Sequence, residues 1–336
     1  MKSVIYSCIV FLCTLLSLVS CNSSDKPLKF AIVSDLHASA MPDGKERVQA
    51  VVDAANKENV DFLIQLGDFI RLDSISRSLD SIWNEYEGEK YHVLGNHDLD
   101  AYTKEEFLKG FGIPNRYYSF DKGDFHFIVL DGNNLYDGKE YSHYAKSNYL
   151  KAKSDMRAFV DPEQLEWLIN DLAATDKKCI LFSHQSIDSF MNNGDEVRAV
   201  LENANKHAGF KKVVLAFSGH NHSNYTKEIN GITYIQINSA SYVWVGKPTM
   251  TEKRYPQAIN EKYRLLRYSI TYDKPLYAIV TLAKDRIDIK GTQADFLPPT
   301  PQDLGLGDSI DIYPLVSIIA DAQIDLDCGI YLDFAW

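Results

Sequence analysis

Residues 91–98 read Tyr-His-Val-Leu-Gly-Asn-His-Asp and carry more information about the fold than any other stretch of the chain. Tyr91–Leu94 is a short, largely apolar run that is typical of a buried strand. The next four residues combine a glycine, an amide, an imidazole and a carboxylate. Loops on a rigid scaffold often carry functional side chains, so this pattern predicts a functional loop at the end of a strand.

Four further loops have the same arrangement, in which residues able to bind a metal follow an apolar run. They are Asp35-Leu36-His37 after Lys29–Ser34, Gly67-Asp68 after Asp61–Leu66, His184 after Cys179–Phe182, and Gly219-His220-Asn221-His222 after Val213–Phe217. Each loop alone is a weak signal, because a single Asp or His is more often a structural residue. Side chains at the carboxyl ends of neighbouring strands meet at one edge of a sheet, so the loops together predict one shared site.

Strands and helices alternate along the body of the chain. This predicts an α/β fold of two mixed β-sheets packed as a sandwich and flanked by helices. We expect one domain over residues 29–295, with helices at 46–56, 75–86, 103–108, 161–172 and 196–205. Residues 243–272 have little periodicity and are expected to form a long loop or lid. Residues 296–336 are expected to be an appended acidic and apolar segment that packs on the core.

The N-terminus has the pattern of an export signal. Lys2 precedes an apolar run from Val4 to Val19, and Leu18-Val19-Ser20-Cys21 resembles the lipobox of bacterial lipoproteins, whose cysteine is acylated. The resemblance implies a signal peptide at residues 1–20, a lipid on Cys21 and a polar tether at 21–28. We therefore expect an exported, membrane-anchored lipoprotein that faces the periplasm or the cell surface. An uncleaved membrane anchor and a buried core helix are the alternatives.

Composition limits the partners of the protein. The chain has 336 residues and a formal net charge of -11, which does not favour binding of long nucleic acids. The acidity is equally compatible with a role in solubility alone. Of the five cysteines, only Cys179 and Cys328 follow Cys21, so we expect neither a disulfide framework nor a zinc site of the CxxC kind. The sequence does not indicate an oligomeric state.

The set of loops resembles the calcineurin-like metallophosphoesterase superfamily, which has Asp-x-His, Gly-Asp, Gly-Asn-His-Asp or -Glu, His and Gly-His-x-His in this order. No expected ligand position is substituted, and His37 distinguishes the chain from purple acid phosphatases. The resemblance implies two divalent metal ions, with Mn, Fe and Zn as candidates. One ion would be held by Asp35, His37, Asp68 and His222, and the other by Asp68, Asn96, His184 and His220.

The resemblance also implies a mechanism of phosphate ester hydrolysis. The two cations would lower the pKa of a bound water, and the resulting hydroxide would attack phosphorus. His97 would protonate the leaving oxygen as a general acid, and Asp98 would orient the imidazole of His97. A structural role for Asp98, such as capping the loop, is the alternative.

The substrate is a small phosphorylated molecule on this interpretation. Residues 117–134 and 162–168 look similar to manganese-dependent ADP-ribose/CDP-alcohol diphosphatases and to bacterial cyclic-AMP phosphodiesterase-like proteins. We expect hydrolysis of a phosphodiester or a nucleotide-linked pyrophosphate. The alternatives are a phosphomonoesterase, including a phosphoprotein phosphatase, and a catalytically idle binding module on the same fold. Tyr242 and Trp244 could stack on a base or sugar, or simply pack in the core.

Overall fold

The computed structural model describes residues 26–69 and 76–326. The expected signal peptide, Cys21 and Cys328 lie outside these ranges. Within them, no helix combines the length and the apolar character needed to cross a membrane.

Two six-stranded sheets form the centre of the molecule, and both contain parallel and antiparallel pairs. The first has the order β18 (Ala322–Asp325), β15 (Arg286–Lys290), β14 (Ala278–Leu282), β1 (Leu28–Val33), β2 (Phe62–Gln65) and β3 (Glu89–His92). The second has the order β10 (Tyr225–Ile229), β11 (Ile232–Gln236), β9 (Val213–Ser218), β8 (Lys178–Ser183), β5 (Phe125–Val129) and β4 (Tyr118–Lys122). Strands β1, β2 and β3 run parallel to one another, as do β5, β8, β9 and β11.

The main core lies between the sheets and is rich in phenylalanine. Phe30 of β1 stacks on Phe62 of β2 with 4.7 Å between ring centroids, and its edge meets the rings of Phe127, Phe182 and Phe217 from the second sheet. Aromatic pairs of this kind are worth about 0.5–1.5 kcal/mol each beyond the area that they bury. Because side chains alternate along a strand, every second residue of β1 faces this core and the others face the helices.

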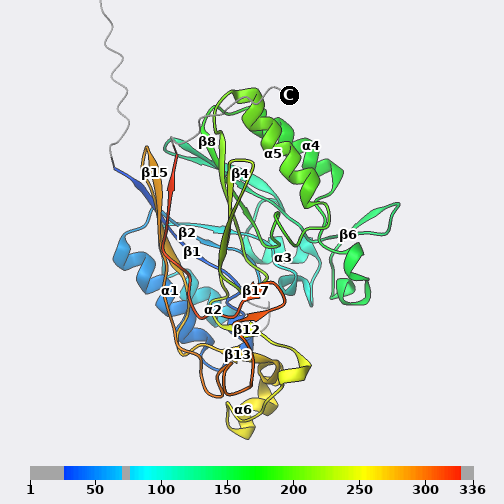
Figure 1. The fold of residues 1–336 in the computed structure, drawn as a ribbon, viewed down its shortest axis with the longest axis vertical. Coiled ribbons are helices and arrows are strands. Elements are labelled where there is room, and N and C mark those ends of the chain that lie inside the picture. The colour runs from blue at the N-terminus through cyan, green and yellow to red at the C-terminus, as the bar shows by residue number, and fades with distance from the viewer. Residues whose placement is uncertain (1–25, 70–75, 327–336) are drawn as a thin grey trace, which may run out of the picture.

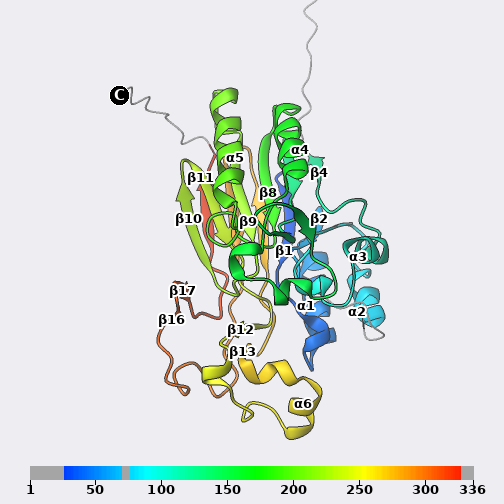
Figure 2. The same ribbon diagram turned by 90° about the vertical axis from the view of Figure 1, so that its right-hand side faces the viewer.

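Helices cover the outer face of each sheet (Figure 2). Helices α1 (Gly44–Glu58) and α2 (Ser76–Trp83) pack on the first sheet, and α4 (Pro162–Ala173) and α5 (Gly194–Ala208) pack on the second. Helix α3 (Lys104–Phe111) begins with a capping box between Thr103 and Glu106, as its sequence pattern indicates. The layers confirm the predicted fold class of two mixed sheets flanked by helices.

The prediction of a patternless loop at 243–272 is wrong. Strand β12 (Tyr242–Trp244) pairs with β13 (Ser269–Thr271), and α6 (Gln257–Lys262) lies between them, below the sheets in Figure 1. This pairing joins residues far apart in the sequence, so no local pattern announces it. Short 3-10 turns, which local patterns also miss, lie at Ala38–Ala40, His97–Leu99, Asn148–Lys151, Ser154–Met156, Lys247–Thr249 and Arg264–Tyr268.

The segment after residue 295 contributes secondary structure of its own. Strand β18 pairs with β15 and forms the edge of the first sheet. Strands β16 (Ser309–Ile310) and β17 (Tyr313–Pro314) form a small hairpin, as do β6 (Asn134–Tyr136) and β7 (Tyr141–His143) in the middle of the chain. The β16–β17 hairpin lies close to the carboxyl ends of the central strands, where it borders the site described next.

Candidate metal centre

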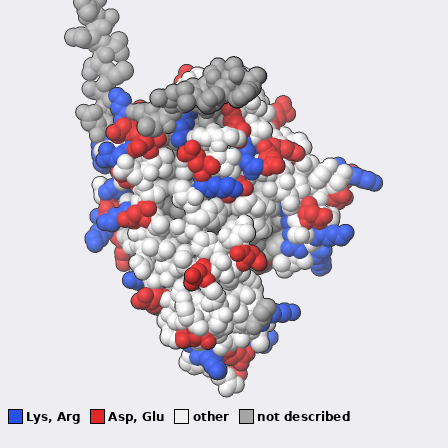
Figure 3. Space-filling view, viewed as in Figure 1, with Lys and Arg blue, Asp and Glu red and all other residues white. Residues whose placement is uncertain are grey.

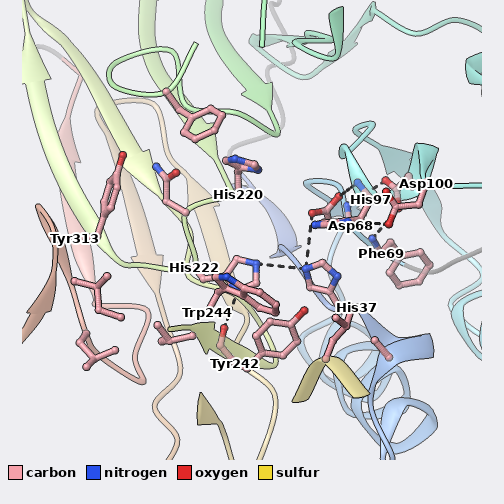
Figure 4. A pocket seen from close by; sticks show the side chains of 18 of the residues that line it. His37, Asp68, Phe69, His97, Asp100, His220, His222, Tyr242, Trp244 and Tyr313 are labelled. Atoms are coloured by element: carbon pink, nitrogen blue, oxygen red, sulfur yellow. Dashed lines mark hydrogen bonds and ion pairs between the residues drawn. The ribbon is translucent and has the colours of Figure 1, made fainter. Parts of the chain in front are cut away.

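A cavity of about 660 Å³ opens at the carboxyl ends of β1, β2, β3, β8 and β9. Loops after these strands supply all seven predicted ligands. Five of the cavity's residues appear around the same space in Figure 4: His37, Asp68, His97, His220 and His222. The position follows from the parallel strands, which deliver their following loops to one edge of each sheet.

The first ligand group consists of Asp35, His37 and His222, whose donor atoms all lie within 4.8 Å of one another. Oδ1 of Asp35 is 3.2 Å from Nε2 of His222. Nε2 of His37 is 3.3 Å from Nε2 of His222. Three potential ligand atoms thus surround one small volume.

The second group consists of Asp68, His184 and His220, again within 4.8 Å. Nε2 of His184 lies 3.3 Å from Oδ2 of Asp68 and 3.1 Å from Nδ1 of His220. Oδ1 of Asn96 is 3.1 Å from the same Nε2 and adds a neutral oxygen. Oδ2 of Asp68 also lies 3.7 Å from Nε2 of His37, so this carboxylate stands between the two groups, as a bridging ligand must.

In two of the histidines, a hydrogen bond donated by Nδ1 leaves Nε2 available as a metal ligand. Nδ1 of His184 donates to the carbonyl oxygen of Leu66 at 2.8 Å, and Nδ1 of His222 donates to the carbonyl oxygen of Tyr242 at 2.9 Å. In a neutral ring each Nε2 then presents a lone pair to the neighbouring carboxylate. Metal-bound histidines are typically fixed in this way, so the two groups fit a pair of cations.

The charges of the site also favour bound cations. Burial lowers the pKa of His37 and of His220 to about 3, which keeps both rings neutral, the form that binds metals. Burial also lowers the pKa of His184, but Asp68 and Asp35 outweigh it and raise the value to about 9. Oδ1 of Asp35 is buried and has no hydrogen-bond partner. The carboxylates therefore attract positive charge to the space between the rings, and divalent cations would supply it.

The ligand loops have an unusual backbone. Asp35, His37, Asp68, His220 and His222 all have positive φ, between 44° and 74°. This left-handed region is uncommon for residues with a side chain, and its occurrence at functional sites reflects strain that the surrounding fold maintains.

Glycines allow the loops to approach one another. A Cβ on Gly95 would lie 2.2 Å from both the backbone nitrogen and Oδ1 of Asp68, and one on Gly67 would lie 2.7 Å from Cα of Gly95. These contacts are too close for any side chain. They explain why a glycine precedes both Asp68 and Asn96.

The predicted contact between Asp98 and His97 is wrong. The Asp98 carboxylate instead accepts hydrogen bonds from the backbone nitrogens of Asp68 at 3.1 Å, Phe69 at 3.0 Å and Gly95 at 2.8 Å. Asp98 thereby joins the loop of Asp68 to the loop of Gly95. This agrees with the alternative given above, in which Asp98 has a structural role. The reason is geometric, because the 3-10 turn that starts at His97 points the following side chain into the protein.

Asp100 is the residue that contacts His97, and sequence reasoning missed it. Nδ1 of His97 lies 2.9 Å from Oδ2 of Asp100, and the hydroxyl of Tyr149 donates to Oδ1 of Asp100 at 2.7 Å. Burial lowers the pKa of His97, but Asp68 and the bond to Asp100 raise it above its ordinary value. The available signal was the spacing of three residues, which brings two side chains together in a helical turn.

The chain matches the family model described as calcineurin-like phosphoesterase over residues 28–224. It is 22% identical over 280 residues to the manganese-dependent ADP-ribose/CDP-alcohol diphosphatase of Arabidopsis thaliana, covering 65% of this chain and 88% of that protein. The crystal structure of a dimetal phosphatase from Danio rerio has a similar fold, with a TM-score of 0.58 and 17% identity over 81% of this chain and 99% of that one.

The family model spans more than half of the chain and includes every ligand described above. Two groups of candidate ligands, with the Asp68 carboxylate between them, fit a pair of divalent ions. The chain therefore belongs to the calcineurin-like phosphoesterase family and is a metal-dependent phosphoesterase with two divalent metal ions.

Proposed function

We propose that this protein hydrolyses small-molecule phosphodiester or nucleotide-linked pyrophosphate bonds. The observation that carries the proposal is that members of both ligand groups border a single cavity together with His97: His37 and His222 from the first group, and Asp68 and His220 from the second. A phosphate bound to the metals would lie within reach of His97, the one histidine among the described cavity-lining residues that is not assigned to a metal. The diphosphatase activity in the name of the Arabidopsis relative supports the same type of bond.

The positions of the ligands assign them to two cations. Asp35, His37 and His222 would hold one cation, His184, His220 and Asn96 would hold the other, and Asp68 would contribute to both. When bound, the pair supplies an activated water and neutralises charge on the phosphoryl oxygens. Manganese, the metal in the relative's name, is the first candidate.

His97 is the proposed general acid. Its side chain is 40% exposed to the cavity, whereas the ring of His184 is fully buried. Asp100 holds Nδ1 of His97, which leaves Nε2 of the same ring free to donate a proton to the leaving oxygen. Asp98 acts indirectly, because its hydrogen bonds hold the loops of Asp68 and Gly95 together.

A diester fits the charge of the cavity better than a monoester does. None of the described residues that line it is Lys or Arg. A monoester dianion would therefore rely on the metals alone for both charges, whereas a diester carries only one. Phosphomonoester hydrolysis is the alternative that the assay below distinguishes.

The test compares two esters of the same leaving group. The full chain, purified in detergent and loaded with Mn²⁺, is assayed with bis-p-nitrophenyl phosphate and with p-nitrophenyl phosphate. We expect faster cleavage of the diester and loss of both activities in the Asp68→Asn variant. Faster cleavage of the monoester would overturn the diester assignment. No cleavage of either ester with Mn²⁺, Zn²⁺ or Fe²⁺ would refute the enzymatic role.

We also propose that the chain is exported and anchored by a lipid on Cys21. The support is the sequence around Leu18–Cys21. Strand β1 starts at Leu28, and its other end leads to Asp35 at the metal centre. A tether at residues 21–28 would thus attach at the end of the sheet remote from the cavity, which leaves the cavity open to solutes.

A further inference from the structure

Part of the cavity lining consists of apolar side chains that are exposed or partly exposed. We call the set Phe190, Trp244, Leu265, Ile310 and Pro314 the apolar wall. Trp244 is 46% exposed and Leu265 is 45% exposed, although both are large and hydrophobic. Large apolar side chains exposed together at a functional site mark a binding surface.

The apolar wall is held in a fixed position relative to the metal ligands. The ring of Phe190 lies 4.0 Å from that of His220, centroid to centroid. Ser223, which follows His222, donates a hydrogen bond to the carbonyl oxygen of Pro314 at 2.9 Å. Asn238 donates to the carbonyl oxygen of Val316 at 2.8 Å and fixes the segment that follows the hairpin. A group attached to a metal-bound phosphate would therefore meet a preformed surface.

The charge around the cavity selects against additional anionic groups. The described lining residues include the carboxylates of Asp100 and Asp311 but no Lys or Arg. On the face seen in Figure 3, the area over β12 and β17 carries uncharged residues and carboxylates. A second phosphate would meet no cationic side chain among these residues and would be repelled by the carboxylates.

We propose that the apolar wall binds an uncharged alkyl or aryl substituent of a phosphodiester that carries a single negative charge. The proposal rests on the proposed function, because the phosphate must be bound at the metal centre, and it selects the phosphodiester over the nucleotide-linked pyrophosphate. Water adds its oxygen to phosphorus, the bond to one ester oxygen breaks, and that oxygen leaves with a proton. The remaining monoester keeps the apolar substituent.

The test varies only this substituent. The Mn²⁺-loaded full chain is assayed with p-nitrophenyl phosphodiesters whose second ester is methyl, butyl, phenyl, glyceryl or choline, so that p-nitrophenolate is always the leaving group. We expect kcat/KM to rise about tenfold from methyl to phenyl, because the larger group buries more apolar surface. The glyceryl ester should react no faster than the methyl ester.

Variants of the wall provide the second arm. Trp244→Ala and Ile310→Asn should flatten the series, so that the ratio of kcat/KM between the phenyl and the methyl ester falls toward one. Ile312→Ala is the matched control, because Ile312 lies on the same hairpin, is 79% exposed and does not line the cavity. It should leave the whole series unchanged.

The outcomes separate this proposal from the one on which it rests. Hydrolysis of no ester in the series would refute the phosphodiesterase function itself. Equal rates across the series would refute the apolar subsite alone. The highest rate with the choline ester would replace it by a site for cations, and faster hydrolysis of ADP-ribose than of the phenyl diester would replace it by a site for nucleotides.

Discussion

His97 and Asp100 form a hydrogen-bonded pair, with Nδ1 of the imidazole 2.9 Å from Oδ2 of the carboxylate. The pair makes Asp100 a positioning residue for the proposed general acid. Asp100→Asn keeps the shape of the side chain but removes its charge. We expect kcat to fall about a hundredfold for alkyl esters, which need protonation of the leaving oxygen, and little for p-nitrophenyl esters, which do not.

A plot of log kcat against the pKa of the leaving group checks this prediction. The slope should be steeper for Asp100→Asn than for the wild type, and the slope for His97→Ala should equal that for Asp100→Asn. A uniform loss for all leaving groups would mean that Asp100 only stabilises the loop.

Bound metal should stabilise the fold as well as support catalysis. An ion present at a hundred times its dissociation constant stabilises the native state by about 2.7 kcal/mol. We expect a chelator to lower the Tm and Mn²⁺ to restore it. In Asp68→Asn the shift caused by Mn²⁺ should be much smaller, because Asp68 stands between both ligand groups. An unchanged shift in this variant would contradict a shared ligand.

Gly95→Ala should disrupt the site, because the added Cβ would lie 2.2 Å from the backbone nitrogen of Asp68. We expect loss of at least one of the two bound metals, measured by elemental analysis, together with a lower Tm. Gly307→Ala is a suitable control, since a Cβ there meets no atom within 4 Å. Full metal content in Gly95→Ala would contradict this prediction, because it would show that the loops of Gly95 and Asp68 can move apart without losing a metal.

We expect His126, which lies far from the metal centre, to make a pH-dependent contribution to the free energy of unfolding. Its ring lies 2.7 Å from Oδ1 of Asp121 and 2.8 Å from Oδ2 of Asp171. Burial lowers the pKa of His126, but these carboxylates raise it above its ordinary value of 6.5. The protonated ring therefore favours the folded state, and its contribution is complete below pH 6.5 and lost as the pH rises through the folded-state pKa.

Chemical denaturation at several pH values tests this contribution. His126→Gln should lower the free energy of unfolding by about 1–2 kcal/mol at low pH, and the difference should shrink at high pH. His207→Gln is the control, because His207 is exposed and its Nδ1 contacts the carbonyl oxygen of Asn203, which carries no charge. A difference between wild type and His126→Gln that does not change with pH would contradict the charged pair.

The proposed lipid on Cys21 has a direct test. Cys21→Ser should abolish labelling with palmitate and move the protein from the membrane fraction to the soluble fraction of the producing cells. Activity toward soluble esters should not change, because the tether precedes β1 and the cavity lies at the opposite end of that strand. A variant that is still labelled would rule out Cys21 as the acylated residue.

Much of the fold and the ligand set was predictable because both follow local patterns. An apolar run followed by a polar loop marks each of β1, β2, β3, β8 and β9, and parallel strands bring their ends together. The resemblance of the loops to a known family then assigned the individual ligands. Neither step required knowledge of contacts between distant residues.

The parts that were missed depend on such contacts or on backbone detail. The partner of His97 is Asp100 and not the predicted Asp98, because of one 3-10 turn that the order of residues does not reveal. The pairing of β12 with β13 and the position of the β16–β17 hairpin are non-local. Asp35 and His222 have a left-handed backbone, which residue types other than glycine do not indicate from the sequence.

The metal ligands all precede residue 223, whereas Trp244, Leu265, Ile310 and Pro314 come later in the chain. If the apolar wall selects the substrate as proposed, most of the residues that choose the ester follow, in the chain, the residues that hold the metals. Substitutions at these later positions would then change the preferred ester while every metal-binding side chain stays the same.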